Sequence, residues 1–584
     1  MRVLLVHPED SPEQGPWAEQ NWDRLVDLGQ AGPSAYERWG ARFRCRAGPV
    51  GLPGAEDFRA VRGLLESGLG RLCDTEGLDW WELTALLVHK DMEIVQVLRK
   101  FAGSLHPNDE LFVTRPGFYA DALGLLGTAT PRSFGEIKKG RKPGHYLDVA
   151  RRFPLAQLRE IFWDKYDAAH TIRSRFTRAR KASPRPVVLL PSSYENVTRM
   201  VMAYAATLPA QDFLLVTTRR SGAAVSPPAN VATAKLASYV SARGTTAAEL
   251  VELQGRWRQL RHELELIPEM AVIAKLGLLD LFPKMLRQGL GVRDAWLGVL
   301  EREPVKAVLC GDDANPYTHI PMLLAGKRGI PMLACHHGAL DGRHLIKQNH
   351  ADIILVKGKM EEDYMVRVCG VPAECVEVGA PARPPWGSST DAAIDRHAKG
   401  NSIVMFSEFY EVSNGRAEQF YYELIPALAE LAAQSGRSLV IKLHPFEPQS
   451  ERRALVEKVL PASLRATTRV MSGPLTDGLL DQAWFGITIL STVTTECAFR
   501  GIPCFLCKWL EFWPYGYIDQ YGKFGAGAVL NSAAEIAAIP RILENCMVTP
   551  AIKCSLWQPI APDRFAELLT TKKMPVDVAA MSRA

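Results

Sequence analysis

Short, mostly apolar runs that end abruptly in polar residues recur along this chain. They lie at residues 2–6, 110–114, 187–190, 213–217, 307–310, 331–335, 351–356 and 403–406. Such runs are typical of strands that are buried on both faces of a parallel sheet. Helical patterns separate several of them, for example at 197–206 and 417–434. The alternation predicts an α/β protein.

Two breaks in this alternation divide the chain. Residues 135–183 are basic and helical in pattern, and they lead to Pro184 and Pro186. The segment Gly379-Ala-Pro-Ala-Arg-Pro-Pro385, with the polar stretch after it, is the best linker in the sequence. We therefore predict an N-terminal α/β region with a helical extension (1–185), a Rossmann-like domain (186–395), and a second Rossmann-like domain with a tail (396–584).

Composition and charge narrow the classes of function. The chain has 584 residues, of which 47% are hydrophobic and 23% charged, as in an ordinary globular protein. A net charge of +5 is small for this length and does not indicate a nucleic-acid partner. No apolar stretch approaches the ~20 residues that span a bilayer. We expect a cytoplasmic protein, and the basic segment 135–183 is either a solvated helix face or a contact with a membrane surface or polyanion.

The stretch from Ser438 to Pro503 carries the first candidate site. Lys442 and His444 follow one buried run, and Ser491 and Thr492 follow another. Ligands of open α/β sheets gather outside the carboxyl ends of such strands, where the next helix presents free N–H groups. Lys442, His444, Ser491 and Thr492 are therefore candidate phosphate ligands. The alternative is a Lys and a His at a domain surface and ordinary N-cap hydroxyls.

Glu496 lies about one turn into the helix that is predicted after Thr492. A carboxylate at this place can accept hydrogen bonds from ribose hydroxyls, as acidic residues do in dinucleotide folds. It can equally complement the helix dipole. Both interpretations stay open at this point.

A second candidate site is the loop His336-His337-Gly338, which directly follows the run at 331–335. A neutral histidine at a strand end is suited to general base catalysis near pH 7. Successive side chains of an extended backbone point to opposite sides, so we expect one of the two histidines to face a ligand. Gly338 allows close approach beside His337, which makes His337 the favoured base and His336 the second candidate. A structural histidine that caps the loop is the alternative.

Three further patterns are weaker. Asp312-Asp313 after the run at 307–310 could bind a metal, but no further ligand pattern accompanies it, so no metal site is predicted. The aromatic run from Trp509 to Tyr521 either packs under a loop or stacks on a sugar or base. The turn at 191–196 lacks the glycines and lysine of a Walker A motif.

Together, these motifs resemble the two-Rossmann glycosyltransferase architecture called GT-B. The resemblance rests on their order: Gly329-Ile-Pro-Met-Leu-Ala-Cys-His-His-Gly338, Val378-Gly-Ala-Pro381, Lys442-Leu-His-Pro445, and Ser491-Thr492 with Glu496 and Gly501-Ile-Pro503. It covers about residues 186–534. The motifs are most similar to those of bacterial capsule sugar transferases, polysialyltransferases and the glycerophosphotransferases of teichoic acid synthesis.

The resemblance implies two Rossmann-like domains that face a cleft, with the donor nucleotide mainly on the C-terminal half. It implies that His444, Ser491 and Thr492 hold the donor phosphates, that Glu496 contacts the ribose, and that a histidine of the first half is the base. The doubled histidine leaves His337 and His336 as the choices for that base. A nucleotide-activated sugar would be the substrate, with no cofactor and no metal.

The function expected from this resemblance is transfer of a sugar, or a polyol phosphate, to an acceptor hydroxyl in bacterial surface polysaccharide synthesis. The acceptor would be a carbohydrate or a lipid-linked molecule, and the enzyme cytoplasmic or peripheral to the inner membrane. One alternative is a sugar-nucleotide epimerase on the same fold. Another is a non-catalytic protein of polysaccharide assembly that binds a sugar or nucleotide.

Overall fold

The computed structural model describes most of the chain. The described residues are 1–29, 31–127, 131–134, 181–219, 222, 226–239, 247–313, 315–338, 340, 342–347, 351–384, 400–408, 410, 417–512, 514–544 and 550–571. The basic stretch predicted at 135–183 therefore lies almost wholly outside the described residues. No helix within the described ranges is long and apolar enough to cross a membrane.

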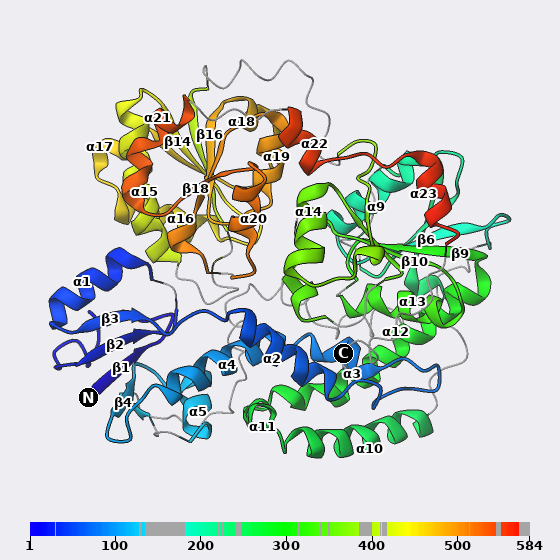
Figure 1. Cartoon of the computed structure of the whole chain (residues 1–584), viewed down its shortest axis with the longest axis horizontal. Coiled ribbons are helices and arrows are strands. Elements are labelled where there is room, and N and C mark those ends of the chain that lie inside the picture. Colours follow the sequence, from blue (N-terminus) through cyan, green and yellow to red (C-terminus); the bar gives the residue numbers. More distant parts are fainter. Residues whose placement is uncertain are drawn as a thin grey trace. The chain divides into compact units, whose positions relative to one another are not determined.

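The chain forms two compact units, each built from separate segments (Figure 1). Unit 1 contains the described residues of Met1–Asp57, Glu93–His145 and Ser389–Leu556. Unit 2 contains those of Phe58–Met92, Tyr146–Ser388 and Trp557–Ala584. Unit 1 holds two of the three sheets found among the described residues, and unit 2 holds the third.

The C-terminal sheet of unit 1 has six parallel strands in the order β15-β14-β13-β16-β17-β18. Their bounds are Ser402–Phe406 (β13), Ser438–Lys442 (β14), Thr468–Met471 (β15), Ala483–Thr488 (β16), Cys504–Cys507 (β17) and Ala528–Leu530 (β18). Counted along the chain this is the order 3-2-1-4-5-6 of a Rossmann sheet, which reverses between β13 and β16.

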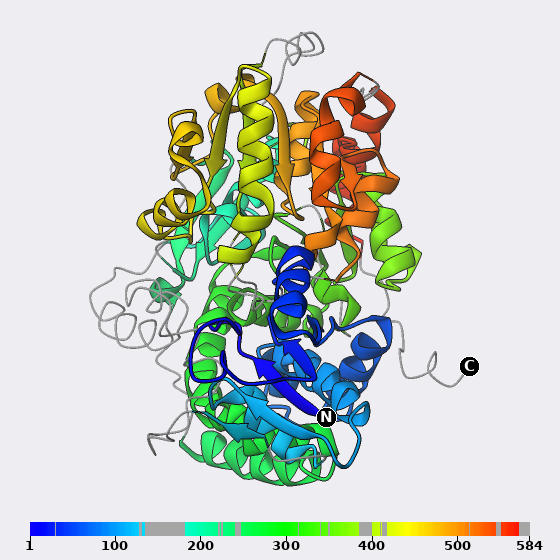
Figure 2. The ribbon, with the colours of Figure 1, turned by 90° about the vertical axis from the view of Figure 1, so that its left-hand side faces the viewer.

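Helices cover both faces of this sheet. Figure 1 shows α15 (Ala417–Gln434) on one side and α19 (Val493–Arg500) and α20 (Tyr517–Lys523) on the other. In Figure 2, α15 is the yellow helix that lies across the sheet. Because both faces are covered, β13 is buried along its whole length, which explains its continuous apolar sequence.

The N-terminal sheet of unit 1 has five parallel strands in the order β3-β2-β1-β4-β5. Their bounds are Arg2–Val6 (β1), Arg24–Asp27 (β2), Arg46–Pro49 (β3), Glu110–Val113 (β4) and Arg132–Ser133 (β5). The helix α1 (Pro33–Phe43) links this sheet to α15, because the backbone N–H and the hydroxyl of Ser34 donate to Glu423 at 2.9 and 2.7 Å.

The middle sheet of unit 2 has seven parallel strands in the order β12-β11-β10-β9-β6-β7-β8. Their bounds are Val187–Ser192 (β6), Phe213–Thr217 (β7), Val231–Lys235 (β8), Val305–Cys310 (β9), Met332–Cys335 (β10), Ile353–Val356 (β11) and Val376–Val378 (β12). The order again reverses once, between β6 and β9. Residues of α9 (Glu195–Thr207) and α23 (Pro562–Leu568) share one apolar core with these strands.

The predicted α/β architecture, with two Rossmann-like sheets and an additional N-terminal α/β region, is confirmed by these topologies. The central strands match the apolar runs closely, whereas β3, β5, β8, β15 and β18 were not predicted. All five lie at sheet edges, and β3, β8 and β15 leave several of their residues partly or fully exposed. A half-exposed strand has no continuous apolar run to reveal it.

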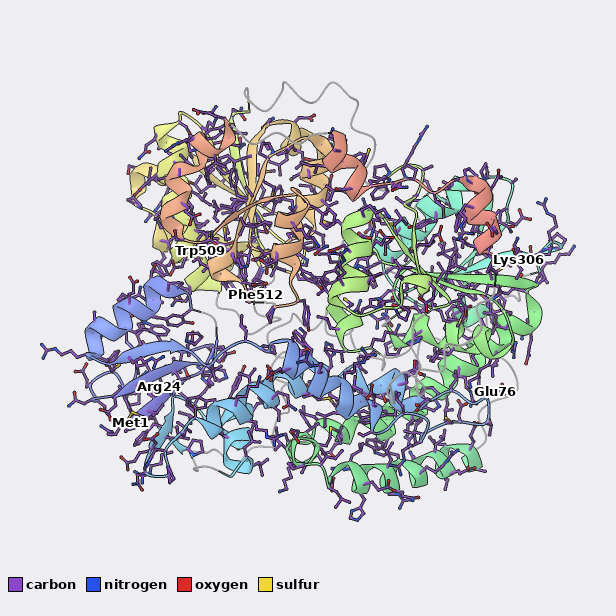
Figure 3. The ribbon with its side chains drawn as sticks, in the orientation of Figure 1. Met1, Arg24, Glu76, Lys306, Trp509 and Phe512 are labelled. Carbon is purple, nitrogen blue, oxygen red and sulfur yellow. The ribbon has the colours of Figure 1, made fainter. Side chains whose placement is uncertain are left out.

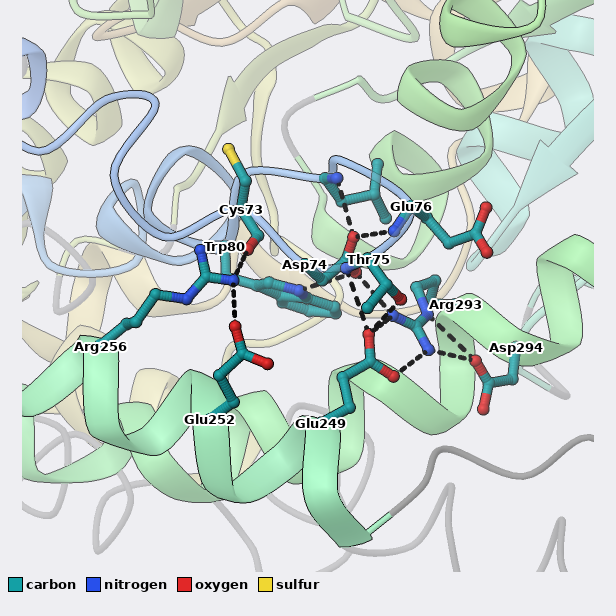
Figure 4. Close-up of polar contacts among 11 residues, drawn as sticks. Cys73, Asp74, Thr75, Glu76, Trp80, Glu249, Glu252, Arg256, Arg293 and Asp294 are labelled. Carbon is teal, nitrogen blue, oxygen red and sulfur yellow. Dashed lines mark hydrogen bonds and ion pairs between the residues drawn. The ribbon is translucent and has the colours of Figure 1, made fainter.

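A buried ion cluster anchors the helical part of unit 2 (Figure 4). Arg293 lies on α12 (Phe282–Arg302) and is 3% exposed. Its Nη1 donates to Asp74 at 2.9 Å and to Glu249 of α10 (Ala247–Leu264) at 2.6 Å, and its Nη2 donates to Asp294 at 2.8 Å. The guanidinium of Arg293 thus connects the loop at Asp74 with both helices.

Candidate functional site

In each Rossmann-like sheet, the two strands at which the order reverses end beside each other. In the C-terminal sheet these are β13 and β16, and in the middle sheet β6 and β9. Ligands of open α/β sheets bind outside the carboxyl ends at such switch points. The polar residues that follow these four strands, and the neighbouring strands β14 and β10, are therefore the candidate functional groups.

Lys442, the last residue of β14, is 7% exposed. Its Nζ donates to the carbonyl oxygens of Leu443 at 2.9 Å and Gly473 at 2.6 Å. Burial lowers the pKa of this ammonium group. One N–H group therefore joins β14 to the loop after β15, a second bonds the carbonyl of the next residue, and the third is left for a ligand.

His444 lies just beyond Lys442 and is held in one tautomer. The backbone N–H of Phe446 donates to its Nδ1 at 3.3 Å. Burial, with the nearby charge of Lys442, lowers the pKa of His444 to about 4. The ring is consequently neutral near pH 7 and carries its proton on Nε2, so His444 offers a hydrogen-bond donor and no positive charge.

Ser491 and Thr492 follow β16 in the turn that opens α19. Thr492 is exposed and Ser491 partly so, and the Val493 N–H lies 3.4 Å from the Ser491 hydroxyl. The N–H groups of Val493, Thr494 and Thr495 already donate to residues 491–492, so the two hydroxyls and the positive end of the helix dipole are the groups that can bind an anion here. Glu496, one turn later, lies 3.1 Å from Arg500 of the same helix, so this ion pair already uses one carboxylate oxygen.

Two glutamates that the sequence analysis did not select complete this edge. Glu447 is buried and accepts hydrogen bonds from the Ser407 hydroxyl, the His444 N–H and Arg452, at 2.8–2.9 Å. It fixes the backbone that carries His444. Glu408 accepts from the Thr488 hydroxyl and the Leu490 N–H, both at 2.8 Å. Glu408 lies two residues after β13, which is the signal that could have revealed it.

His337 belongs to a polar group at the switch point of the middle sheet. The Tyr194 hydroxyl, after β6, donates to Asp312 Oδ2, after β9, at 3.1 Å. The hydroxyl oxygen of Tyr194 lies 3.3 Å from both ring nitrogens of His337. Tyr194, which the sequence analysis did not select, thus contacts a histidine 143 positions later in the sequence.

The backbone of the loop around His337 is fixed by a buried lysine, Lys357. Strand β10 ends at Cys335, so the extended alternation does not continue into the two histidines, and their ring centroids lie 4.6 Å apart. The Nζ of Lys357, which is 3% exposed, donates to the Gly338 carbonyl oxygen at 2.5 Å and to Glu361 at 3.1 Å. Lys357 therefore fixes the backbone beside His337.

Asp312 and Asp313 are each engaged by a cation from residues 342–347. Arg343 lies 3.3 Å from Asp312, and Lys347 lies 2.6 Å from Asp313. Asp313 is buried, and although burial itself acts in the opposite direction, the charge of Lys347 holds its pKa well below the usual range. No group of three or more possible metal ligands was found among the described residues.

The aromatic run after β17 mostly packs inside unit 1. Phe512 is 4% exposed and its ring centroid lies 5.7 Å from Tyr410 and 5.5 Å from Phe420 (Figure 3). The Tyr515 hydroxyl donates to Glu93 at 2.9 Å. Trp513 lies outside the described residues. The packing interpretation accounts for Phe512 and Tyr515 without a bound sugar.

No protein-family model and no curated protein sequence matches the chain. Among solved structures, the chain is similar to MnaA of S. aureus with UDP, at 12% identity over 67% of this chain and 100% of that one, with a TM-score of 0.38. The chain is also similar to MurG of Acinetobacter baumannii, at 14% identity over 66% of this chain and 99% of that one, with a TM-score of 0.37. A third similar structure is UDP-GlcNAc 2-epimerase of Methanocaldococcus jannaschii in complex with UDP-GlcNAc and UDP. Its identity is 10% over 66% of this chain and 100% of that one, with a TM-score of 0.40.

Proposed function

We propose that this chain is a GT-B glycosyltransferase that transfers a sugar, or a polyol phosphate, from a nucleotide-activated donor to an acceptor hydroxyl. The observation that carries the proposal is the C-terminal sheet. Its strand order is that of nucleotide-binding Rossmann sheets, and His444, Ser491 and Thr492 follow its strands as neutral hydrogen-bond donors. The second Rossmann-like sheet, in unit 2, supplies a candidate base.

The donor phosphates are the proposed ligands of unit 1. The His444 Nε2–H, the remaining N–H of Lys442, the hydroxyls of Ser491 and Thr492, and the start of α19 would bind them. Such groups stabilise the charge that develops on the departing phosphate. The proposed reaction therefore requires neither a metal nor a cofactor. Glu496 is the proposed ribose contact.

His337 is the proposed general base, and His336 is the alternative. The base removes the proton of the acceptor hydroxyl, and the hydroxyl oxygen attacks the anomeric carbon, or the phosphorus of a polyol phosphate donor. The bond to the nucleotide phosphate breaks, and the electron pair leaves with that phosphate. Asp312 and Tyr194 support His337 through the hydrogen bonds described above.

The biological setting is also a proposal. The motifs resemble those of bacterial surface polysaccharide enzymes, which favours a carbohydrate or lipid-linked acceptor and a cytoplasmic enzyme that can associate with the inner membrane. No nucleic-acid partner is proposed, because the net charge is only +5.

A thermal-shift screen against CMP, CDP, UDP, GDP and ADP tests the proposal. A nucleotide at 100 times its Kd stabilises the folded state by about 2.7 kcal/mol, which raises Tm measurably. We expect one base to be preferred. The absence of any shift would contradict the proposal. Turnover of the matching sugar nucleotide without an acceptor would instead indicate the epimerase alternative.

A further inference from the structure

Glu408 occupies the switch point of the C-terminal sheet. It lies two residues after the end of β13 and accepts a hydrogen bond from Thr488, the last residue of β16, 80 positions later. Its carboxyl group therefore lies between the two strand ends at which ligands of Rossmann sheets bind. The next residues after its partner Leu490 are Ser491 and Thr492, the proposed phosphate ligands.

The two oxygens of Glu408 are unequal. Oε1 accepts both the Thr488 hydroxyl and the Leu490 N–H at 2.8 Å. Oε2 accepts no hydrogen bond of ordinary length from a described residue, although the backbone N–H of Ile489 also interacts with the carboxyl group. Glu408 is only 8% exposed, yet Oε2 is not one of the fully buried polar atoms that lack a partner. Oε2 is thus the atom that a bound molecule can reach.

The surroundings of Glu408 favour its neutral form. Burial, together with the nearby carboxylate of Glu447, raises its pKa to about 7, against the hydrogen bonds from 488–490. Tyr410 and Cys507 are the other titratable groups that interact with Glu408. No described Lys, Arg or His forms an ion pair with it. Because Oε1 already accepts two donors, the proton of the neutral form belongs on Oε2.

We propose that Glu408 binds the donor nucleotide as a carboxylic acid, with its Oε2–H donating to a phosphate oxygen. The inference rests on the proposed function and names a residue and a proton for the same site. An ionised Glu408 would repel the phosphate, and the protonated group donates to it instead. Nucleotide binding near neutral pH therefore takes up a proton from solvent, and departure of the nucleotide returns it.

Calorimetry measures this proton directly. The nucleotides CMP, CDP, UDP, GDP and ADP are titrated into the full chain at pH 7.5, in two buffers of different ionisation enthalpy. A carboxyl group with a pKa of about 7 is roughly one quarter protonated at that pH, so complete protonation takes up about three quarters of a proton. We expect the uptake of the wild type to exceed that of Glu408→Gln by up to this amount.

The substitution Glu408→Gln suits this test because the amide oxygen keeps the bonds from Thr488 and Leu490 and the amide N–H keeps a donor. Glu511→Gln is the matched control, since Glu511 also lies in unit 1 and burial raises its pKa to about 7. Its proton uptake should equal that of the wild type. Thr488→Val is a second variant, which retains Glu408 but loses one bond to its ionised form, so it should take up fewer protons.

The outcomes separate the two proposals. If no nucleotide binds the wild type, the proposed function fails and this inference fails with it. If a nucleotide binds but the wild type and Glu408→Gln take up the same number of protons, only the role of Glu408 is refuted. Greater uptake in Glu408→Gln would mean that the ionised carboxylate accepts a hydroxyl, which also refutes it. Loss of the uptake in Glu511→Gln would assign the proton to Glu511.

Discussion

Tyr194 and Asp312 are hydrogen-bonded at 3.1 Å across the point where the middle sheet reverses its strand order, 118 residues apart in the sequence. The tyrosine hydroxyl also lies 3.3 Å from the ring nitrogens of His337. A carboxylate that orients a histidine through a tyrosine supports a base at this position, because it favours the imidazolium that forms after proton transfer.

Tyr194→Phe should therefore reduce kcat about 5-fold, since a neutral hydrogen bond contributes about 1 kcal/mol. The Kd of the nucleotide in unit 1 should not change. Steady-state transfer assays and calorimetry measure the two quantities. Tyr422→Phe is the control, because the Tyr422 side chain is exposed on α15. An unchanged kcat in Tyr194→Phe would remove the tyrosine from the proposed mechanism.

His444→Ala should weaken nucleotide binding by roughly 10- to 100-fold, because hydrogen bonds to charged groups contribute about 1.5–3 kcal/mol. The measurement is the Kd of the preferred nucleotide. His106→Ala is a matched control: His106 also precedes a proline, and its Nδ1 accepts the Asn108 N–H at 3.3 Å, as His444 accepts Phe446. Equal affinities of the two variants would contradict phosphate binding by His444.

His319 should make the protein sensitive to acid. Burial lowers its pKa to about 3, so the folded state keeps it neutral while the unfolded state protonates it near 6.5. The contribution of His319 to the free energy of unfolding is complete above pH 6.5 and is lost as the pH falls toward 3. The loss between pH 6.5 and 5 is about 2 kcal/mol. His319→Gln should show a smaller decrease of Tm over that range. His106 is exposed, so the decrease of Tm in the control variant His106→Gln should equal that of the wild type.

Arg293→Met should destabilise unit 2 by about 3–5 kcal/mol, because it leaves the buried carboxylate of Asp74 and the mostly buried carboxylate of Glu249 without their cation. Chemical denaturation monitored by fluorescence measures the loss. Arg261→Met is the control: Arg261 pairs with Glu265 and Asp280 but is 30% exposed, and such surface pairs contribute about 0–1 kcal/mol. Similar losses in the free energy of unfolding in both variants would show that the Arg293 cluster does not stabilise unit 2 more than a surface ion pair does.

Glu249 adds a pH dependence to this cluster. Its hydrogen bonds with Arg293 lower its pKa to about 2, against burial. A depressed carboxylate stabilises the fold fully above pH 4.5 and loses this effect as the pH falls through 2. Arg293→Met should therefore narrow the difference in stability between pH 5 and pH 3, measured by denaturant titration at both values.

The sequence by itself determined the α/β class and most central strands, because a strand buried on both faces must be apolar throughout, and that is a local property. It also located the polar residues after those strands, including His337, His444 and Ser491. The strand order is not a local property and was not determined by the sequence patterns. It follows from which strands pair, and it placed β13 beside β16 and β6 beside β9.

What each polar residue does was decided only by the tertiary structure. Lys442 was predicted as a phosphate ligand, yet backbone carbonyls take two of its N–H groups. His444 became a neutral donor through burial, and Glu408 acquired its raised pKa in the same way. Tyr194 met His337 because strand order brought distant loops together. Burial and long-range pairing set charge and geometry, and neither can be read from the residues that are adjacent in sequence.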